Sequence, residues 1–170
     1  MSRILYISDT HFGHRNIIRY ENRPFSSVQE MNEELIRRWN SVVTSEDTVV
    51  HGGDFALCNK EVATHICHSL NGYKILVKGN HDGNTKRMLD IGFDVVVENY
   101  FNDGILVNHY PDRVRQEYYD LCNIFLYGHV HSKIPHNKPS KGINISCEVL
   151  DYTPRTIEEL LKKNEKELKK

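Results

Sequence analysis

Short runs of hydrophobic residues, each followed directly by polar residues, recur along the first part of the chain. Residues 3–8, 48–51 and 73–77 are predicted strands, because their apolar side chains alternate or run continuously between polar loops. Between them, apolar side chains recur at helical spacing, and Ser27 and Glu30 have the spacing of a capping box. The predicted helices cover residues 16–20, 28–42, 60–70 and 85–91.

A β-hairpin is predicted further along the chain. Residues 95–101 and 105–108 are largely apolar, and the Asp-Gly dipeptide between them is typical of a tight turn. Two more strands are expected over residues 124–127 and 143–149, and a capping box at Thr156 opens a lysine-rich helix.

The order of these elements indicates the fold class. Strands that alternate with helices pair in parallel, whereas the later hairpin adds antiparallel strands. We therefore expect an α/β fold in which a layered, mixed β-sheet sandwich is flanked by helices. With 170 residues the chain has the length of one ordinary domain, so we expect a single domain over residues 1–170.

Composition narrows the class of protein. Hydrophobic residues make up 39% and charged residues 26% of the chain, which is typical of globular proteins. No apolar run has the roughly 20 residues needed to span a bilayer, so we expect no membrane association. The first residues lack a signal-peptide layout, so we expect a cytoplasmic location. The four cysteines occur singly, which favours reduced thiols over disulfides.

The net charge of the chain indicates which kinds of substrate it can bind. The formal net charge is −1, whereas a protein that binds long nucleic acid by bulk electrostatics needs a strongly basic surface. A small phosphate-ester or nucleotide-like substrate is therefore favoured over extended nucleic acid. The ten histidines are the unusual feature of the composition, and their positions direct the functional interpretation.

Nitrogen and oxygen donors cluster directly after predicted strands. Ligands gather outside the carboxyl ends of strands in such sheets, so these donors are expected to lie together. Mixed imidazole and carboxylate donors suit manganese best here, with iron, zinc, nickel or magnesium as alternatives, and two ions that share one carboxylate would account for the number of donors. The candidate ligands are Asp9, His11, Asp54, Asn80, His109, His129 and His131.

The ordered motifs resemble those of the calcineurin-like metallophosphoesterase family, whose pattern is D-x-H, G-D, G-N-H-D, H and G-H-x-H. A lone D-x-H or H-x-H would be weak evidence, but all the blocks occur here in order. In this chain they are Asp9-Thr10-His11, Gly53-Asp54, Gly79-Asn80-His81-Asp82, His109 and Gly128-His129-Val130-His131.

The resemblance implies a dinuclear metal-dependent phosphoesterase in which Asp54 bridges the two ions. It implies that Asp9, His11 and His131 complete the first site and that Asn80, His109 and His129 complete the second. A hydroxide between the cations would attack the phosphate. His81 would donate a proton or hydrogen bond to the leaving oxygen, and Asp82 would orient His81 and raise its pKa.

Other candidates have two interpretations each. His14 either contacts the substrate phosphate or caps the next helix. Arg15, Arg19 and Arg23 recur every four residues, so a helix would place them on one side. They either bind phosphate or form a solvated basic face. The second interpretation is favoured, because Pro24 interrupts the helix. Tyr110, beside His109, is a further candidate substrate contact.

The expected activity is hydrolysis of a phosphate ester, with a diester favoured because so compact a chain leaves no room for a cap domain over the site. Two alternatives stay open within the enzyme class, a phosphomonoesterase and a nuclease. An inactive scaffold that binds a partner is the alternative from another class, but it would be expected to lack part of the motif, and no part is missing.

Overall fold

The computed structural model describes residues 2–137 and 139–168, and its strands form two sheets. The first sheet has five strands and is parallel except at its edge with β9, which runs antiparallel to β1. In spatial order these strands are β4 (Val95–Val97), β3 (Tyr73–Val77), β2 (Thr48–His51), β1 (Ile4–Ile7) and β9 (Arg155–Thr156).

The second sheet has four strands, of which only β5 runs antiparallel to its neighbour. Asp103 and Gly104 turn the chain between β5 and β6, and both adopt positive φ, as an Asp-Gly hairpin turn requires. In spatial order the strands are β5 (Tyr100–Asn102), β6 (Ile105–Asn108), β7 (Ile124–Tyr127) and β8 (Gly142–Asn144).

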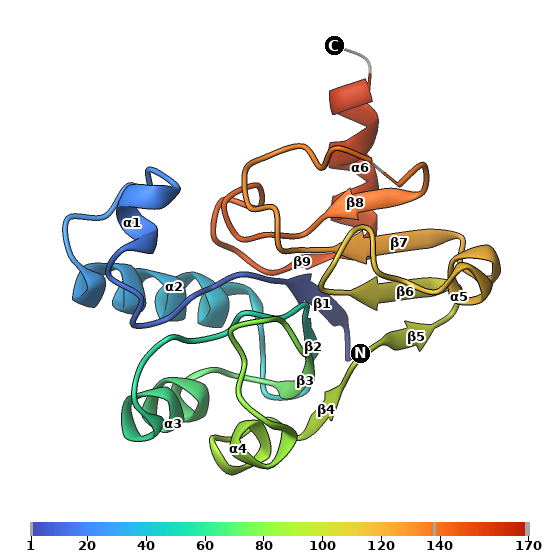
Figure 1. Cartoon of the computed structure of the whole chain (residues 1–170). Helices are drawn as coiled ribbons and strands as arrows, with labels where there is room; N and C mark the ends of the chain where they lie inside the picture. Colours follow the sequence, from blue (N-terminus) through green and yellow to red (C-terminus); the bar gives the residue numbers. More distant parts are fainter. Residues whose placement is uncertain (1, 138, 169–170) are drawn as a thin grey trace.

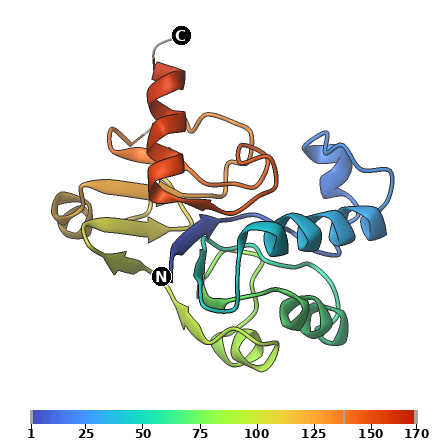
Figure 2. The ribbon, with the colours of Figure 1, turned by 180° about the vertical axis from the view of Figure 1, so that it is seen from behind.

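Helices cover the outer faces of this sandwich (Figures 1 and 2). Three of them, α2 to α4, lie on the side of the first sheet that faces away from the second, and α5 lies beyond the second sheet. The helices are α1 (Ile17–Tyr20), α2 (Val28–Val42), α3 (Lys60–Ser69), α4 (Thr85–Asp90), α5 (Gln116–Leu121) and α6 (Ile157–Leu168).

Alternating side chains of the second sheet pack in two directions. Val107 and Leu126 belong to the main core, which also contains Ile7 and Val50 of the first sheet. Leu106 instead packs in a separate cluster on the opposite face, under α5. One hydrophobic core therefore joins the two sheets, as expected for a layered sandwich.

Several details differ from the sequence prediction. The apolar run 95–101 is not one hairpin strand, because β4 joins the first sheet and β5 the second. In the second sheet only β5 and β6 pair antiparallel, as the predicted hairpin requires. The other two pairs of neighbouring strands in this sheet are parallel. The strand expected over 143–149 ends at Asn144, beyond which Ser146 makes an isolated bridge to Ser8. Two elements, α5 and β9, were not predicted from the sequence.

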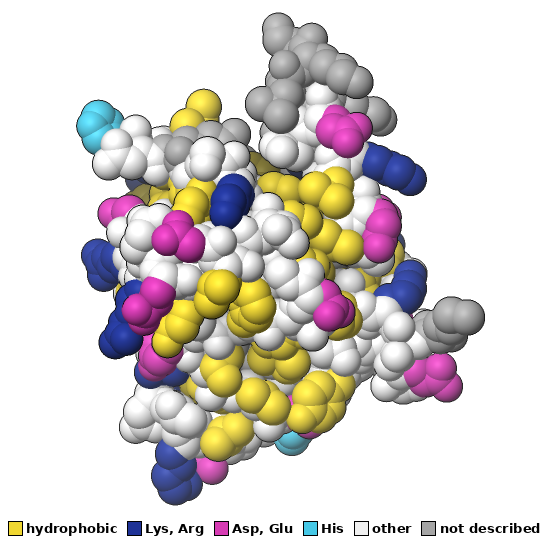
Figure 3. All heavy atoms as spheres, turned by 90° about the vertical axis from the view of Figure 1, so that its right-hand side faces the viewer, with side chains coloured by type: hydrophobic (Ala, Val, Ile, Leu, Met, Phe, Trp, Pro, Cys, Tyr) yellow, Lys and Arg dark blue, Asp and Glu magenta, His cyan; other side chains and the backbone are white. Residues whose placement is uncertain are grey.

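Figure 3 shows one face of the molecule, the side on the right of Figure 1. Hydrophobic side chains there lie among acidic and basic side chains that are interspersed, so this face does not offer the one-sided basic field that long nucleic acid needs. Within residues 2–137 and 139–168, no helix combines the length and the apolar character needed to cross a membrane.

Candidate metal centre

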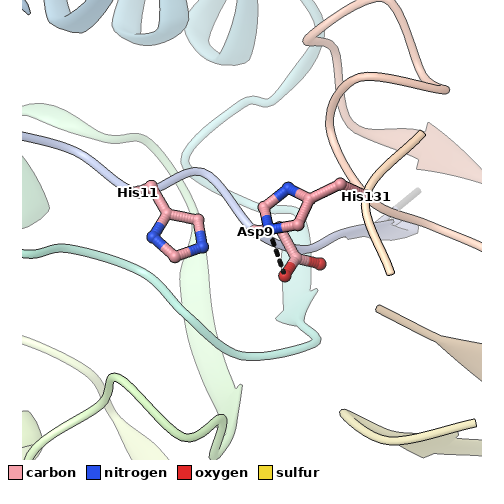
Figure 4. A group of neighbouring side chains, drawn as sticks. All are labelled: Asp9, His11 and His131. Atoms are coloured by element: carbon pink, nitrogen blue, oxygen red, sulfur yellow. Dashed lines mark ion pairs between the residues drawn. The ribbon is translucent and has the colours of Figure 1, made fainter. Parts of the chain in front are cut away.

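The polar loops that follow the parallel strands meet at one edge of the sandwich. Asp9 and His11 follow β1, and His131 reaches them from the loop after β7 (Figure 4). Asp54 follows β2 and His109 follows β6. Parallel pairing of neighbouring strands brings their carboxyl ends together, so donors more than 100 positions apart in the sequence lie side by side.

Two groups of three predicted ligands have donor atoms close enough to hold one ion each, and a third group, Glu21, His131 and Glu148, shares His131 with the first. The first contains Asp9, His11 and His131, with 3.9 Å between His131 Nε2 and Asp9 Oδ1. The second group contains Asp54, His109 and His129. Within it, His129 Nδ1 lies 3.3 Å from His109 Nε2.

Asp54 lies between the two groups. Its Oδ2 atom is 3.5 Å from Nε2 of His11 and 3.4 Å from Nε2 of His109. The side-chain oxygen of Asn80 is 3.2 Å from the same His109 nitrogen, so Asn80 belongs to the second group. The structure thus brings together all the side chains that the sequence analysis named as ligands.

Backbone strain is concentrated in these residues. Asp9, His11, Asp54, His129 and His131 all have φ between 49° and 72°, in the left-handed region that residues other than glycine rarely adopt. Such conformations cost about 1 to 3 kcal/mol each and persist where the surrounding structure enforces them, often at functional sites.

The protonation state of His11 in the first group favours cation binding. His11 is 2% exposed, and neither of its ring nitrogens has a hydrogen-bond partner among the described residues. Burial lowers the pKa of His11 to about 3, so the imidazole is neutral and can donate a lone pair. Burial also raises the pKa of Asp9, an effect that a nearby cation would reverse. Unpaired, buried and neutral, His11 fits a metal ligand.

In the second group the carboxylate of Asp54 is ionised. Burial favours the protonated form of Asp54, but the hydrogen bond and charge of His109 and the N–H of His81 hold its pKa below the usual range. His109 Nδ1 donates to the Gly52 carbonyl oxygen at 2.8 Å, and its Nε2 atom lies toward Asp54 and Asn80.

Close packing against the carboxylates explains two glycines of the motifs. A Cβ atom at Gly79 would overlap the Asp54 side chain and lie 2.6 Å from the Asp54 nitrogen. A Cβ atom at Gly128 would overlap the carboxylate of Asp9. Any larger residue at either position would displace a candidate ligand.

His81 and Asp82 have different surroundings from each other. The His81 ring is exposed at the rim of the site, with its centroid 5.3 Å from that of His11. The expectation that Asp82 orients His81 is wrong: its carboxylate accepts backbone N–H groups of Asp54, Phe55 and Gly79 at 2.8 to 2.9 Å. Asp82 therefore joins the loops after β2 and β3.

Arg23 is neither an exposed basic residue nor free to bind phosphate. It is 4% exposed, and its guanidinium donates to the carbonyl oxygens of Asp9 and Thr10, both at 2.7 Å, and to Glu148 at 2.6 Å. The predicted alignment of three arginines on a helix is also wrong, because α1 spans only Ile17–Tyr20. Arg15 and Arg19 are exposed on this segment.

Glu148 also belongs to the site, although it was not predicted from the sequence. Its Oε1 atom lies 3.0 Å from His131 Nδ1, and its Oε2 atom is buried without a partner among the described residues. Against the effect of burial, His131 and Arg23 lower the pKa of Glu148 to about 2. The available signal was a single charged residue within an otherwise uncharged stretch, residues 142–150.

The remaining two candidates lie at the margin of the centre. The expectation that His14 caps α1 is wrong, since the N-cap is Asn16 and no side chain caps the helix. The His14 ring is half-buried, 5.5 Å from the His11 ring, and its Nδ1 has no partner among the described residues. The Tyr110 ring packs against the imidazoles of His109 and His129 at 4.9 and 5.0 Å.

Comparison with known proteins gives the family. The model of the calcineurin-like phosphoesterase superfamily domain matches residues 2–145. An uncharacterized protein of Methanocaldococcus jannaschii is 37% identical over 173 residues, covering 98% of this chain and 93% of that protein. The Gene 66 protein of Mycobacterium phage L5 is 34% identical over 86 residues, which are 49% of this chain and 41% of that protein.

A solved structure supports the same assignment. The structure of a protein of unknown function from Aquifex aeolicus matches with a TM-score of 0.73 at 30% identity, covering 95% of this chain and 99% of that one. The residues matched by the family model include every motif on which the resemblance rested. The chain therefore belongs to the calcineurin-like phosphoesterase superfamily and is a metal-dependent phosphoesterase.

Proposed function

We propose that the protein hydrolyses a phosphodiester with the aid of two divalent cations. The observation that carries this proposal is the position of Asp54 Oδ2, within 3.5 Å of one imidazole nitrogen from each donor group. A single carboxylate oxygen shared in this way suits two ions about 3.5 to 4 Å apart.

The ligand assignment follows the two groups. Asp9, His11 and His131 would hold the first ion with Asp54, while Asn80, His109 and His129 would hold the second with the same carboxylate. Manganese suits this mixture of imidazole, amide and carboxylate donors. When bound, the cations supply fixed positive charge toward phosphate oxygens and lower the pKa of coordinated water.

The chain's own side chains contribute positioning and proton transfer. His81 is exposed beside His11, where its ring can hold a proton for the leaving oxygen of the ester. Its backbone N–H donates to Asp54 Oδ1 at 2.8 Å, so the same residue orients the shared carboxylate. His14, with an unpaired ring nitrogen, is suited to a hydrogen bond with a phosphate oxygen.

Preference for a diester is supported by the exposure of the rim. Asn80 and His81 are both exposed, so groups on either side of a bound phosphate can extend into solvent. A monoester would leave this space unused. A nuclease acting on long strands is less favoured, because the formal net charge is −1 and long nucleic acid needs a strongly basic surface.

We further infer that the chain works as one domain in a reducing compartment, the cytoplasm. The hydrophobic core that joins both sheets supports a single domain over residues 1–170. All four cysteines are free, and Cys67, Cys122 and Cys147 are buried, which suits a reducing environment.

The test compares manganese-loaded protein with chelated protein on a generic phosphodiester, a generic monoester, 2′,3′-cyclic nucleotides and oligonucleotides. We expect metal-dependent hydrolysis, fastest on small diesters, and manganese analysis with two ions per chain. An Asp54→Asn variant should lose both ions and the activity. Equal activity with and without metal would contradict the mechanism, and faster monoester hydrolysis would contradict the diester preference.

A further inference from the structure

A cavity lies beside the metal centre, beyond Tyr110. Its volume is about 320 Å³, within the range of small-molecule sites. Polar and aromatic side chains of four segments form its walls, at the ends of β3 and β6, between β4 and β5, and in the chain that leads into α5. They include Lys78, Tyr110, Arg113, Arg115 and Tyr118.

Tyr110 separates this cavity from the second donor group. Its ring contacts the imidazoles of His109 and His129, with centroids 4.9 and 5.0 Å away, and also lines the cavity. A ligand whose phosphate lies at the metal centre therefore needs to extend past only one side chain to enter the cavity.

The cavity has an excess of positive charge. Its lining includes Lys78, Arg113 and Arg115 but a single acidic residue, Glu98. The Arg113 guanidinium lies over the Tyr110 ring, 4.2 Å from its centroid, which orients the cation without neutralising it.

The ion pairs of the other two cations are weak. Lys78 is 3.1 Å from Glu98, whose side chain is 73% exposed, and Arg115 is 3.5 Å from the exposed Glu117. Pairs of this kind contribute little in water, so both cations are available to an anion that enters the cavity.

We propose that this cavity binds a second anionic group of the substrate. The inference rests on the proposed function and narrows its substrate class to phosphodiesters that carry a further phosphate, as some nucleotides do. Arg113 and Lys78 would bind that phosphate, and the ring of Tyr118 would form an apolar wall for the sugar or base that links the two.

The test compares inhibitors that differ by one phosphate. Thymidine 3′,5′-bisphosphate can place either phosphate at the metals, so the orientation of the diester need not be known. We expect it to bind manganese-loaded protein about tenfold more tightly than thymidine 5′- or 3′-monophosphate, as the two contacts with Arg113 and Lys78 allow. Affinities are measured by calorimetry and as inhibition constants against bis(p-nitrophenyl) phosphate.

Variants assign the effect to the cavity. Arg113→Gln and Lys78→Gln should each reduce the advantage of the bisphosphate to about threefold or less, as loss of one charged contact implies. Arg37→Gln removes the same charge from α2, away from the cavity, and should keep the wild-type ratio. Equal or undetectable binding of the bisphosphate and the monophosphates, or an unchanged ratio in both cavity variants, would overturn the proposal.

The two proposals can fail separately. A bisphosphate advantage measured by calorimetry in a protein that hydrolyses no ester would support the cavity and contradict the proposed activity. Metal-dependent diester hydrolysis without such an advantage would do the reverse.

Discussion

Glu148 Oε1 accepts a hydrogen bond from Nδ1 of His131 at 3.0 Å. This contact fixes the tautomer of the imidazole and leaves Nε2 toward Asp9, 3.9 Å from its Oδ1. The same Glu148 oxygen accepts from Arg23, which in turn holds the backbone of Asp9. A carboxylate outside the motifs therefore couples two metal-ligand loops.

Removing that carboxylate is expected to weaken metal binding. We expect Glu148→Gln to reduce manganese affinity about 10- to 100-fold, because partners of ligand imidazoles typically contribute this much. Metal analysis after dialysis against graded chelator measures the loss. Glu117→Gln, at an exposed position on α5, is the matched control and should retain metal. Full retention in the Glu148 variant would contradict the role of this residue.

Arg23 is expected to affect stability. Its side chain is buried, so Arg23→Met would leave Glu148 and two carbonyl oxygens without their donor. Breaking a buried pair on one side costs about 3 to 5 kcal/mol, which urea denaturation of the metal-free protein would measure. Arg19→Met, at an exposed site, should change the free energy of unfolding little. Similar values for both variants would show that the Arg23 network contributes nothing.

The strand ends could be predicted from the sequence because each is marked twice, by the end of an apolar run and by a polar motif. The bounds of β2, β3 and β7 agree with the prediction for this reason. The run 95–101 carries no such mark. Its division between two sheets depends on which neighbouring strands pair with each half, and that is a tertiary effect.

The same distinction applies to the site. Asp9 and His129 could be identified because they follow strand ends in known motifs. Arg23 and Glu148 could not, because their importance arises from a contact across 125 positions of the sequence. Their residue types alone suggested an exposed surface, since charged side chains are seldom buried.

Gly79 should not tolerate a methyl group. We expect Gly79→Ala to lose metal binding and activity, because the new Cβ would overlap the Asp54 carboxylate, and the backbone of Asp54 limits relaxation. Gly83→Ala is the control: its Cβ would meet Cδ of Arg87, a flexible side chain that can move. Metal analysis and melting temperature separate loss of the site from loss of the fold. A Gly79→Ala protein with normal metal content would contradict this explanation.

Lowering the pH should weaken the ion pair between Arg3, just before β1, and Asp47, in the loop before β2. Hydrogen bonds from the Arg3 side chain hold the pKa of Asp47 below its usual range, although the buried position opposes this. The stabilisation is complete above the unfolded pKa near 4 and is lost as pH falls toward the lower folded pKa. We expect Asp47→Asn to lower the free energy of unfolding at pH 7 and to flatten its decline between about pH 5 and pH 2. An unchanged decline in urea titrations would contradict the assignment.

The proton of His81 should matter most where the leaving group is poor. An alkoxide leaves with difficulty unless it is protonated, whereas p-nitrophenolate leaves readily without help. We therefore expect His81→Ala to slow an alkyl diester by about 100-fold or more and the p-nitrophenyl diester much less, as general acid catalysis predicts. The backbone N–H that holds Asp54 is kept in this variant, so metal content should not change. His65→Ala, at an exposed position on α3, is the control and should leave both rates unchanged. Equal losses on the two substrates would mean that His81 positions the phosphate rather than protonating the leaving oxygen.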